Sequence, residues 1–188
     1  MVAIFCTALT GSIAAQQPRI DPGWLKLYAE HCAQRVPFQA ILAITTVESG
    51  LNPYALSINY PQQMAHKYGL ANQRINLTRQ PQNITEAVSW MRWFHAHGYT
   101  VSAGLMQVNT EMAQRFRVSP EQLFDPCTNI AIGTAILNSN YDHSLRTLPS
   151  PHAAYSSALS AYNTGSNTAG LTNGYVEKVL SIQSRIQP

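Results

Sequence analysis

The sequence predicts an all-α protein, or a mainly α protein with a small β-hairpin. Apolar residues recur at intervals of three and four through most of the 188-residue chain, which is the period of one helix face. Several of these segments follow an N-cap residue and a proline, a pairing typical of helix starts. The pairs are Asp21-Pro22, Asp125-Pro126 and Ser150-Pro151. No segment of useful length alternates apolar and polar residues as a half-buried strand would.

Two helices are predicted in the first fifty residues. The first begins at Asp21-Pro22 and runs toward Cys32. The second begins after Pro37, and its inward-facing positions follow the helical period. These positions are Phe38, Ile41, Leu42, Thr45 and Glu48. Gly50 is a natural terminator, because glycine readily adopts the left-handed conformation found just after a helix. Glu48 is therefore expected near the end of this helix, among apolar neighbours.

The segment from residue 58 to residue 103 has a polar first part and a helical second part. Its first part is rich in turn-forming residues, so any sheet is expected as a small hairpin within residues 58–82. Asn83 and Glu86 have the spacing of a capping box, which predicts a helix that ends before Gly98. Further helix starts are predicted at 119–122, 125–126 and 150–151, and a last helix over 175–186.

Length and composition fit one globular domain. Residues 1–15 carry no charged side chain and end in small residues, which predicts a signal peptide remnant, with a frayed N-terminal helix as the alternative. Residues 16–188 are then expected to form a single domain. No segment resembles a membrane span. Cys32 and Cys127 would remain in the mature chain, either as a disulfide or as two buried thiols.

The charged residues and histidines argue against two classes of partner. Twelve basic residues face nine acidic ones and are scattered without a run, whereas a nucleic-acid surface would cluster them. The only close pair of histidines, His95 and His97, points to different faces of a helix. We therefore predict neither a nucleic-acid partner nor a metal site.

Glu48 is the best candidate for a catalytic acid. Asp21 and Asp125 stand at helix N-caps, Glu86 and Glu121 lie in first helical turns, and the remaining acidic residues have polar neighbours. Only Glu48 ends an apolar helix and enters a Ser-Gly-Leu-Asn-Pro turn. An apolar surround should raise its pKa and let it donate a proton near neutrality. The alternative is a solvated surface carboxylate.

Three motifs follow one another in a recognisable order. They are Glu48-Ser49-Gly50-Leu51-Asn52-Pro53 with Ser57 nine residues after the acid, Gly104-Leu105-Met106-Gln107, and Ala161-Tyr162-Asn163. Each motif alone is weak, but their order and spacing together make coincidence improbable. The set resembles the soluble lytic transglycosylases, lysozyme-like enzymes that cut the glycan strands of peptidoglycan. The first motif departs from the family pattern by one residue fewer before Asn-Pro.

This resemblance implies a lysozyme-like domain with Glu48 in a groove between two helical lobes. Glu48 would be the single catalytic acid, and no cofactor is implied. The reaction would cleave the β-1,4 bond between N-acetylmuramic acid and N-acetylglucosamine and form 1,6-anhydro-muramic acid ends. Tyr162 would supply a hydroxyl beside Glu48, and Tyr175 would close the groove. The implied substrate-binding residues are Ser57, Met106, Gln107, Asn109, Tyr162, Asn163 and Tyr175.

An insertion at about residues 58–103 points to a subgroup of this family. Together with Phe124-Asp125-Pro126-Cys127-Thr128-Asn129-Ile130, it resembles the transglycosylases of type IV secretion and conjugation systems. That resemblance implies a periplasmic protein whose partners are peptidoglycan strands and components of such an apparatus. Two alternatives stay open: a hydrolytic muramidase on the same scaffold, and an inactive wall-binding assembly protein.

Overall fold

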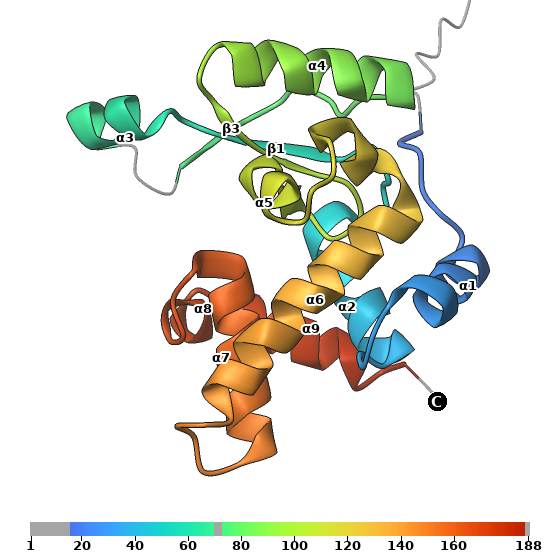
Figure 1. Cartoon of the computed structure of the whole chain (residues 1–188), viewed down its shortest axis with the longest axis vertical. Coiled ribbons are helices and arrows are strands. Elements are labelled where there is room, and N and C mark those ends of the chain that lie inside the picture. Colours follow the sequence, from blue (N-terminus) through green and yellow to red (C-terminus); the bar gives the residue numbers. More distant parts are fainter. Residues whose placement is uncertain (1–15, 70–72, 187–188) are drawn as a thin grey trace, which may run out of the picture.

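Helices form most of the structure, and a small antiparallel sheet lies at one end (Figure 1). The computed structural model describes residues 16–69 and 73–186. The segment predicted as a signal peptide, residues 1–15, lies outside this description. The predicted fold class, mainly α with little sheet, is confirmed.

The helices are α1 (Pro22–Cys32), α2 (Phe38–Ser49), α3 (Gln62–Tyr68), α4 (Ile84–Ala96), α5 (Thr110–Arg115), the 3-10 helix η1 (Pro120–Phe124), α6 (Pro126–Ser144), α7 (Pro151–Thr164), α8 (Ala169–Thr172) and α9 (Tyr175–Gln183). The strands are β1 (Leu56–Asn59), β2 (Arg74–Ile75), β3 (Thr100–Ala103) and β4 (Val108–Asn109). The helix start predicted at 119–122 is thus a short 3-10 helix, and α3, α5 and α8 had not been predicted.

The predicted helix starts have the expected caps. Asp21 accepts a hydrogen bond from the backbone N–H of Gly23 at 2.8 Å, and Asp125 accepts one from that of Thr128 at 2.8 Å. The capping box predicted at the start of α4 is only half formed. Asn83 caps the backbone N–H of Glu86 at 3.0 Å. The Glu86 carboxylate turns away instead, because it accepts from the backbone of Gln82 and pairs with Arg79.

The sheet extends beyond the hairpin predicted within residues 58–82. Its strand order is β2-β1-β3-β4, and all neighbours are antiparallel. The longest pairing joins β1 to β3, from Leu56 opposite Ala103 to Asn59 opposite Thr100. The pairing expected within residues 58–82 is present between β1 and β2, with Ile58 opposite Ile75, but α3 lies between these strands in place of a tight turn. The prediction missed β3 and β4, because β1 and β3 are more than forty residues apart.

Figure 1 shows two lobes joined by α6. The sheet, α3, α4 and α5 form one lobe, while α7, α8 and α9 form the other. α6 packs against α1 and α7, and α2 packs against α9. Within residues 16–69 and 73–186, no helix has both the length and the apolar content needed to span a membrane.

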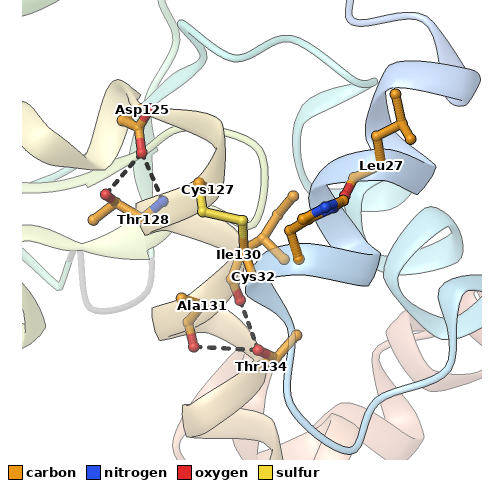
Figure 2. The surroundings of a disulfide bond; sticks show 9 residues. Leu27, Cys32, Asp125, Cys127, Thr128, Ile130, Ala131 and Thr134 are labelled. Atoms are coloured by element: carbon orange, nitrogen blue, oxygen red, sulfur yellow. Dashed lines mark hydrogen bonds between the residues drawn. A yellow bond between two sulfur atoms is a disulfide. The ribbon is translucent and has the colours of Figure 1, made fainter.

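A disulfide joins the end of α1 to the first turn of α6 (Figure 2). The Cα atoms of Cys32 and Cys127 lie 5.4 Å apart, within the range that disulfides require. Asp125 caps the same turn through Thr128. The predicted bridge is confirmed, and the alternative of two free thiols is not what the structure contains.

Candidate active site

Glu48 lies in the last turn of α2, directly before the chain leaves the helix. Gly50 ends α2 in the left-handed conformation, with φ 60° and its backbone N–H bonded to Thr46. Asn52 is buried and its side chain accepts from the backbone N–H of Tyr54 at 2.8 Å. This turn fixes the exit from α2 and leads the chain into β1, so the Glu48 side chain is held at the junction of the helix and the sheet.

The Glu48 carboxyl group has one hydrogen-bond partner in the described residues. The Tyr175 hydroxyl donates to Oε1 of Glu48 at 2.6 Å. Burial raises the pKa of Glu48, while the bond from Tyr175 and the positive charge of Arg74 pull the pKa down. Because burial is the largest cause, the pKa stays above its ordinary value of 4.5. The predicted raised pKa is confirmed.

The two tyrosines near the acid donate to different groups. Tyr162, predicted to place its hydroxyl beside Glu48, lies close enough for the charge of Glu48 to raise its pKa, and it donates to the backbone carbonyl of Met106 at 2.7 Å. Tyr175 is the tyrosine bonded to the acid. Burial, with a smaller effect from the charge of Glu48, raises the pKa of both tyrosines well above 10. Both hydroxyls therefore stay protonated and act as donors.

The Gly104–Gln107 loop connects β3 to β4 beside this cluster. Gly104 has φ 78°, and its N–H donates to the carbonyl of Ala55 at 3.0 Å. Gln107 also has a positive φ, 49°, and its amide donates to the carbonyls of Ala55 and Gly104 at 3.0 and 2.9 Å. Gln107 Oε1 is buried and accepts no hydrogen bond from the described residues. Non-glycine residues in this conformation concentrate at functional sites.

Met106 supports the loop from inside the protein. Its side chain is fully buried, and a Cβ atom added at Gly133 of α6 would come within 2.6 Å of its sulfur. The side chain therefore contacts α6 rather than the surface. A contact between Met106 and a sugar stays a prediction, and the group that this residue directs toward Tyr162 is its backbone carbonyl.

Asn129 is a buried residue whose role the sequence did not indicate. Its amide donates to the carbonyls of Ala103 and Leu123, both at 2.8 Å. Its Oδ1 accepts from the backbone N–H of Met106 at 2.7 Å. One side chain from α6 thus binds both Met106, within the Gly104–Gln107 loop, and Ala103, the residue just before the loop. Because its amide is fully buried, Asn129 requires hydrogen-bond partners, and it has three.

The other predicted binding residues lie on both lobes. Ser57 of β1 accepts a long hydrogen bond, 3.5 Å, from Arg74 of β2. Asn109 ends β4 and caps α5 through the backbone N–H of Glu111. Asn163 accepts from the amide of Asn173 at 2.9 Å. Their contacts with a ligand stay predictions. No motif in the sequence indicated that Arg74 would act on the acid.

The remaining acidic side chains are occupied elsewhere or exposed. All nine acidic residues lie in the described ranges. Apart from Glu48, they cap helices, form ion pairs or face solvent. These residues are Asp21, Glu30, Glu86, Glu111, Glu121, Asp125, Asp142 and Glu177. In the described ranges, no three His, Cys, Asp or Glu side chains gather as metal ligands would.

Two cavities lie away from this cluster. The larger, about 470 Å³, is lined by Gln39, His152, Leu180, Gln183 and Ser184. The smaller, about 280 Å³, lies beside Pro37, Tyr141 and Tyr155. Neither cavity is lined by Glu48. The candidate site is therefore identified by the hydrogen bonding and raised pKa of Glu48, and the groove expected there stays a prediction.

Comparison with known proteins identifies a family and several relatives that this chain resembles. The family model "Transglycosylase SLT domain" matches residues 27–181. The type IV secretion system protein virB1 of Brucella abortus biovar 1 (strain 9-941) is 33% identical over 159 residues, covering 81% of this chain and 61% of that protein. The protein virB1 of Agrobacterium fabrum is 28% identical over 161 residues, covering 86% and 60%. The chain therefore spans about three fifths of these relatives.

Proposed function

The chain belongs to the Transglycosylase SLT domain family, and we propose that it is a lytic transglycosylase that cleaves the β-1,4 bond between N-acetylmuramic acid and N-acetylglucosamine in peptidoglycan. The observation that carries this proposal is the Glu48 carboxyl group, whose burial raises its pKa and which Tyr175 holds by a short hydrogen bond. A carboxyl group in this state can keep a proton near neutral pH and give it to a leaving group.

In the first proposed step, Glu48 acts as the acid. Its proton passes to the glycosidic oxygen while the bond from that oxygen to C1 of muramic acid breaks. The N-acetylglucosamine side leaves with a free hydroxyl, and positive charge develops at C1. The Glu48 carboxylate that results is stabilised by the Tyr175 hydroxyl and by the charge of Arg74, both of which lower the pKa of Glu48.

In the second proposed step, Glu48 acts as the base. The C6 hydroxyl of muramic acid gives its proton to the Glu48 carboxylate, and the C6 oxygen bonds to C1. This closes the 1,6-anhydro ring and returns Glu48 to its protonated form. Hydrolytic enzymes commonly use a second carboxylate, to activate water or as the nucleophile. The other acidic residues are exposed or engaged in caps and ion pairs, which supports the ring-closing reaction over hydrolysis.

The cellular role that we propose is local opening of the cell wall in the periplasm during assembly of a type IV secretion or conjugation apparatus. The support is the likeness to the Brucella type IV secretion system protein virB1. The segment between Ser57 and Gly104, which contains α3, β2, α4 and β3, was part of the predicted resemblance to that subgroup.

The decisive experiment is mass spectrometry of muropeptides released from purified sacculi. The wild-type protein should release products with 1,6-anhydro ends. Glu48→Gln should lower this release at least about 100-fold, because the amide keeps the shape of the side chain and loses the titratable proton. Glu177→Gln is the matched control, since Glu177 is exposed on α9, and it should leave release unchanged.

Two other results would replace the proposal. Products with reducing ends would identify a hydrolytic muramidase. No release by either protein, together with an intact helical circular dichroism spectrum, would favour the wall-binding assembly protein.

A further inference from the structure

One face of the small sheet is polar across all four strands. Residues paired directly across antiparallel strands share a face. Ser57 pairs with Ser102, which pairs with Asn109, and Asn59 pairs with both Thr100 and Arg74. We call this set the polar rows. The opposite face carries the buried residues Leu56, Ile58, Val101, Ala103 and Val108.

Arg74 stands at one end of the polar rows. It lies on the outer strand β2, its side chain is exposed, and it leans toward Ser57 with Nη1 3.5 Å from Oγ. Three other arginines of the described part form ion pairs, namely Arg35 with Asp142, Arg79 with Glu86 and Arg92 with Glu121. No such pair forms at Arg74 among the described residues, so apart from its long bond to Ser57 its guanidinium group can donate hydrogen bonds to an anionic ligand.

Arg74 also acts on the catalytic cluster. Among the described residues it is the charged side chain whose field lowers the pKa of Glu48. The guanidinium therefore lies within electrostatic range of the acid while extending from the sheet. A ligand bound between Glu48 and the polar rows would pass beside this cation.

We propose that Arg74 is a specificity-determining residue that binds a carboxylate carried by the glycan strand near the bond cut at Glu48. This inference rests on the proposed function, because peptidoglycan supplies the carboxylate. In strands without peptides, the lactyl group of muramic acid ends in a free carboxylate. In strands with peptides that group is amide-bonded, and the peptide stem supplies carboxylates of its own. The planar fork of arginine fits either source in a bidentate manner.

The test measures binding of fluorescently labelled strands by anisotropy in the Glu48→Gln background, which keeps the strands intact. Three ligands are compared: strands stripped of peptides, strands with tetrapeptide stems, and neutral chitooligosaccharides. Adding Arg74→Gln should weaken binding of at least one charged ligand about tenfold, consistent with loss of a charge-assisted contact. Binding of the neutral ligand should stay unchanged. The charged ligand that loses affinity identifies the source of the carboxylate.

Matched variants separate recognition from general charge. Arg185→Gln removes the same charge after the end of α9, where the Arg185 side chain donates a hydrogen bond to Ser181, and should leave all three affinities unchanged. Arg74→Lys keeps the charge but loses the fork, so its affinity should fall between those of the parent and of Arg74→Gln.

Some results would overturn the inference. An equal loss for the neutral ligand would assign Arg74 a structural role, and unchanged affinity for all ligands would remove it from binding. If the Glu48→Gln parent bound none of the strands, the proposed function itself would fail, and the inference with it.

Discussion

Two opposing influences set the proton affinity of the Glu48 carboxyl group. Burial favours the neutral form, whereas the Tyr175 hydroxyl and the charge of Arg74 favour the carboxylate. A group that must donate a proton and then take one back needs both forms to be accessible near the working pH. At the scale of residues, the proposed chemistry therefore depends on how burial, Tyr175 and Arg74 together set the pKa of Glu48.

Glu48→Gln should stabilise the folded protein at neutral pH. Because the pKa of Glu48 is raised on folding, the folded state binds this proton more tightly than the unfolded state. The stability that the proton contributes is complete below the ordinary pKa of 4.5 and is lost as pH rises through the folded pKa. Thermal unfolding should therefore give a higher Tm for Glu48→Gln than for wild type at pH 7.5, and equal values near pH 4. A lower Tm at pH 7.5 would contradict the raised pKa.

Tyr175→Phe should move the pH dependence of muropeptide release upward. The hydroxyl lowers the pKa of Glu48, so its removal leaves burial less opposed and the carboxylate forms at higher pH. Release at pH 6 should fall about tenfold through loss of a hydrogen bond to a charged group. Tyr155→Phe is the control, because that hydroxyl donates to Gln183. Identical pH profiles for Tyr175→Phe and wild type would show that Tyr175 does not influence the pKa of Glu48.

Tyr162→Phe should weaken release less than Glu48→Gln does. The variant loses the hydrogen bond to the carbonyl of Met106, which contributes about 1 kcal/mol. If that whole amount is lost from stabilisation of the transition state, the rate falls roughly fivefold. Initial rates of release from sacculi would measure this. Equal losses in the two variants would mean that Tyr162 takes part in proton transfer.

At the scale of elements, the Gly104–Gln107 loop depends on contacts from distant helices. Asn129 of α6 accepts a hydrogen bond from the backbone of Met106 in the loop and donates to Ala103, the residue just before it, while Tyr162 of α7 donates to the carbonyl of Met106. Because Gly104 has no side chain, the loop can pass close to Asn129 and to the carbonyl of Leu123, where a Cβ atom would lie only 2.3 Å from either. The loop is therefore held by packing as much as by its own sequence.

Gly104→Ala should destabilise the protein more than Gly50→Ala. Both glycines have positive φ, so each alanine costs about 1–2 kcal/mol in the backbone. A Cβ at Gly50 meets nothing within 4 Å, whereas one at Gly104 overlaps two neighbours and adds about 1–3 kcal/mol. Urea unfolding at neutral pH would compare the two. Equal midpoints would show that the loop relaxes without cost.

The elements that the sequence predicted are those specified by local signals. α1, α6 and α7 begin at the predicted Asp-Pro and Ser-Pro pairs, because a cap and the helix it starts are adjacent in the chain. β1 and β3 pair across more than forty residues, so no local pattern indicated this pairing. The same reason explains the site. The order of motifs pointed to Glu48, whereas the roles of Asn129 and Arg74 arise from contacts that only the fold creates.

At the scale of the whole molecule, the disulfide ties the N-terminal helix to the helix that joins the two lobes. Cys127 lies two residues before Asn129, so the helical turn that the disulfide fixes also contains the side chain that binds Met106 of the Gly104–Gln107 loop. The bridge spans 95 residues of sequence. Closing so long a loop removes many conformations from the unfolded chain, which stabilises the folded state.

Changing both Cys32 and Cys127 to serine should lower the free energy of unfolding by about 2–5 kcal/mol. Urea unfolding of the variant and of wild type, each with and without a reductant, gives the comparison. The reductant should bring wild type down to the level of the variant and leave the variant unchanged, because both proteins then lack the bridge. A variant as stable as oxidised wild type would mean that packing of α1 against α6 suffices without it. Two free thiols titrated in denatured, unreduced residues 16–188 would show that the bridge does not form.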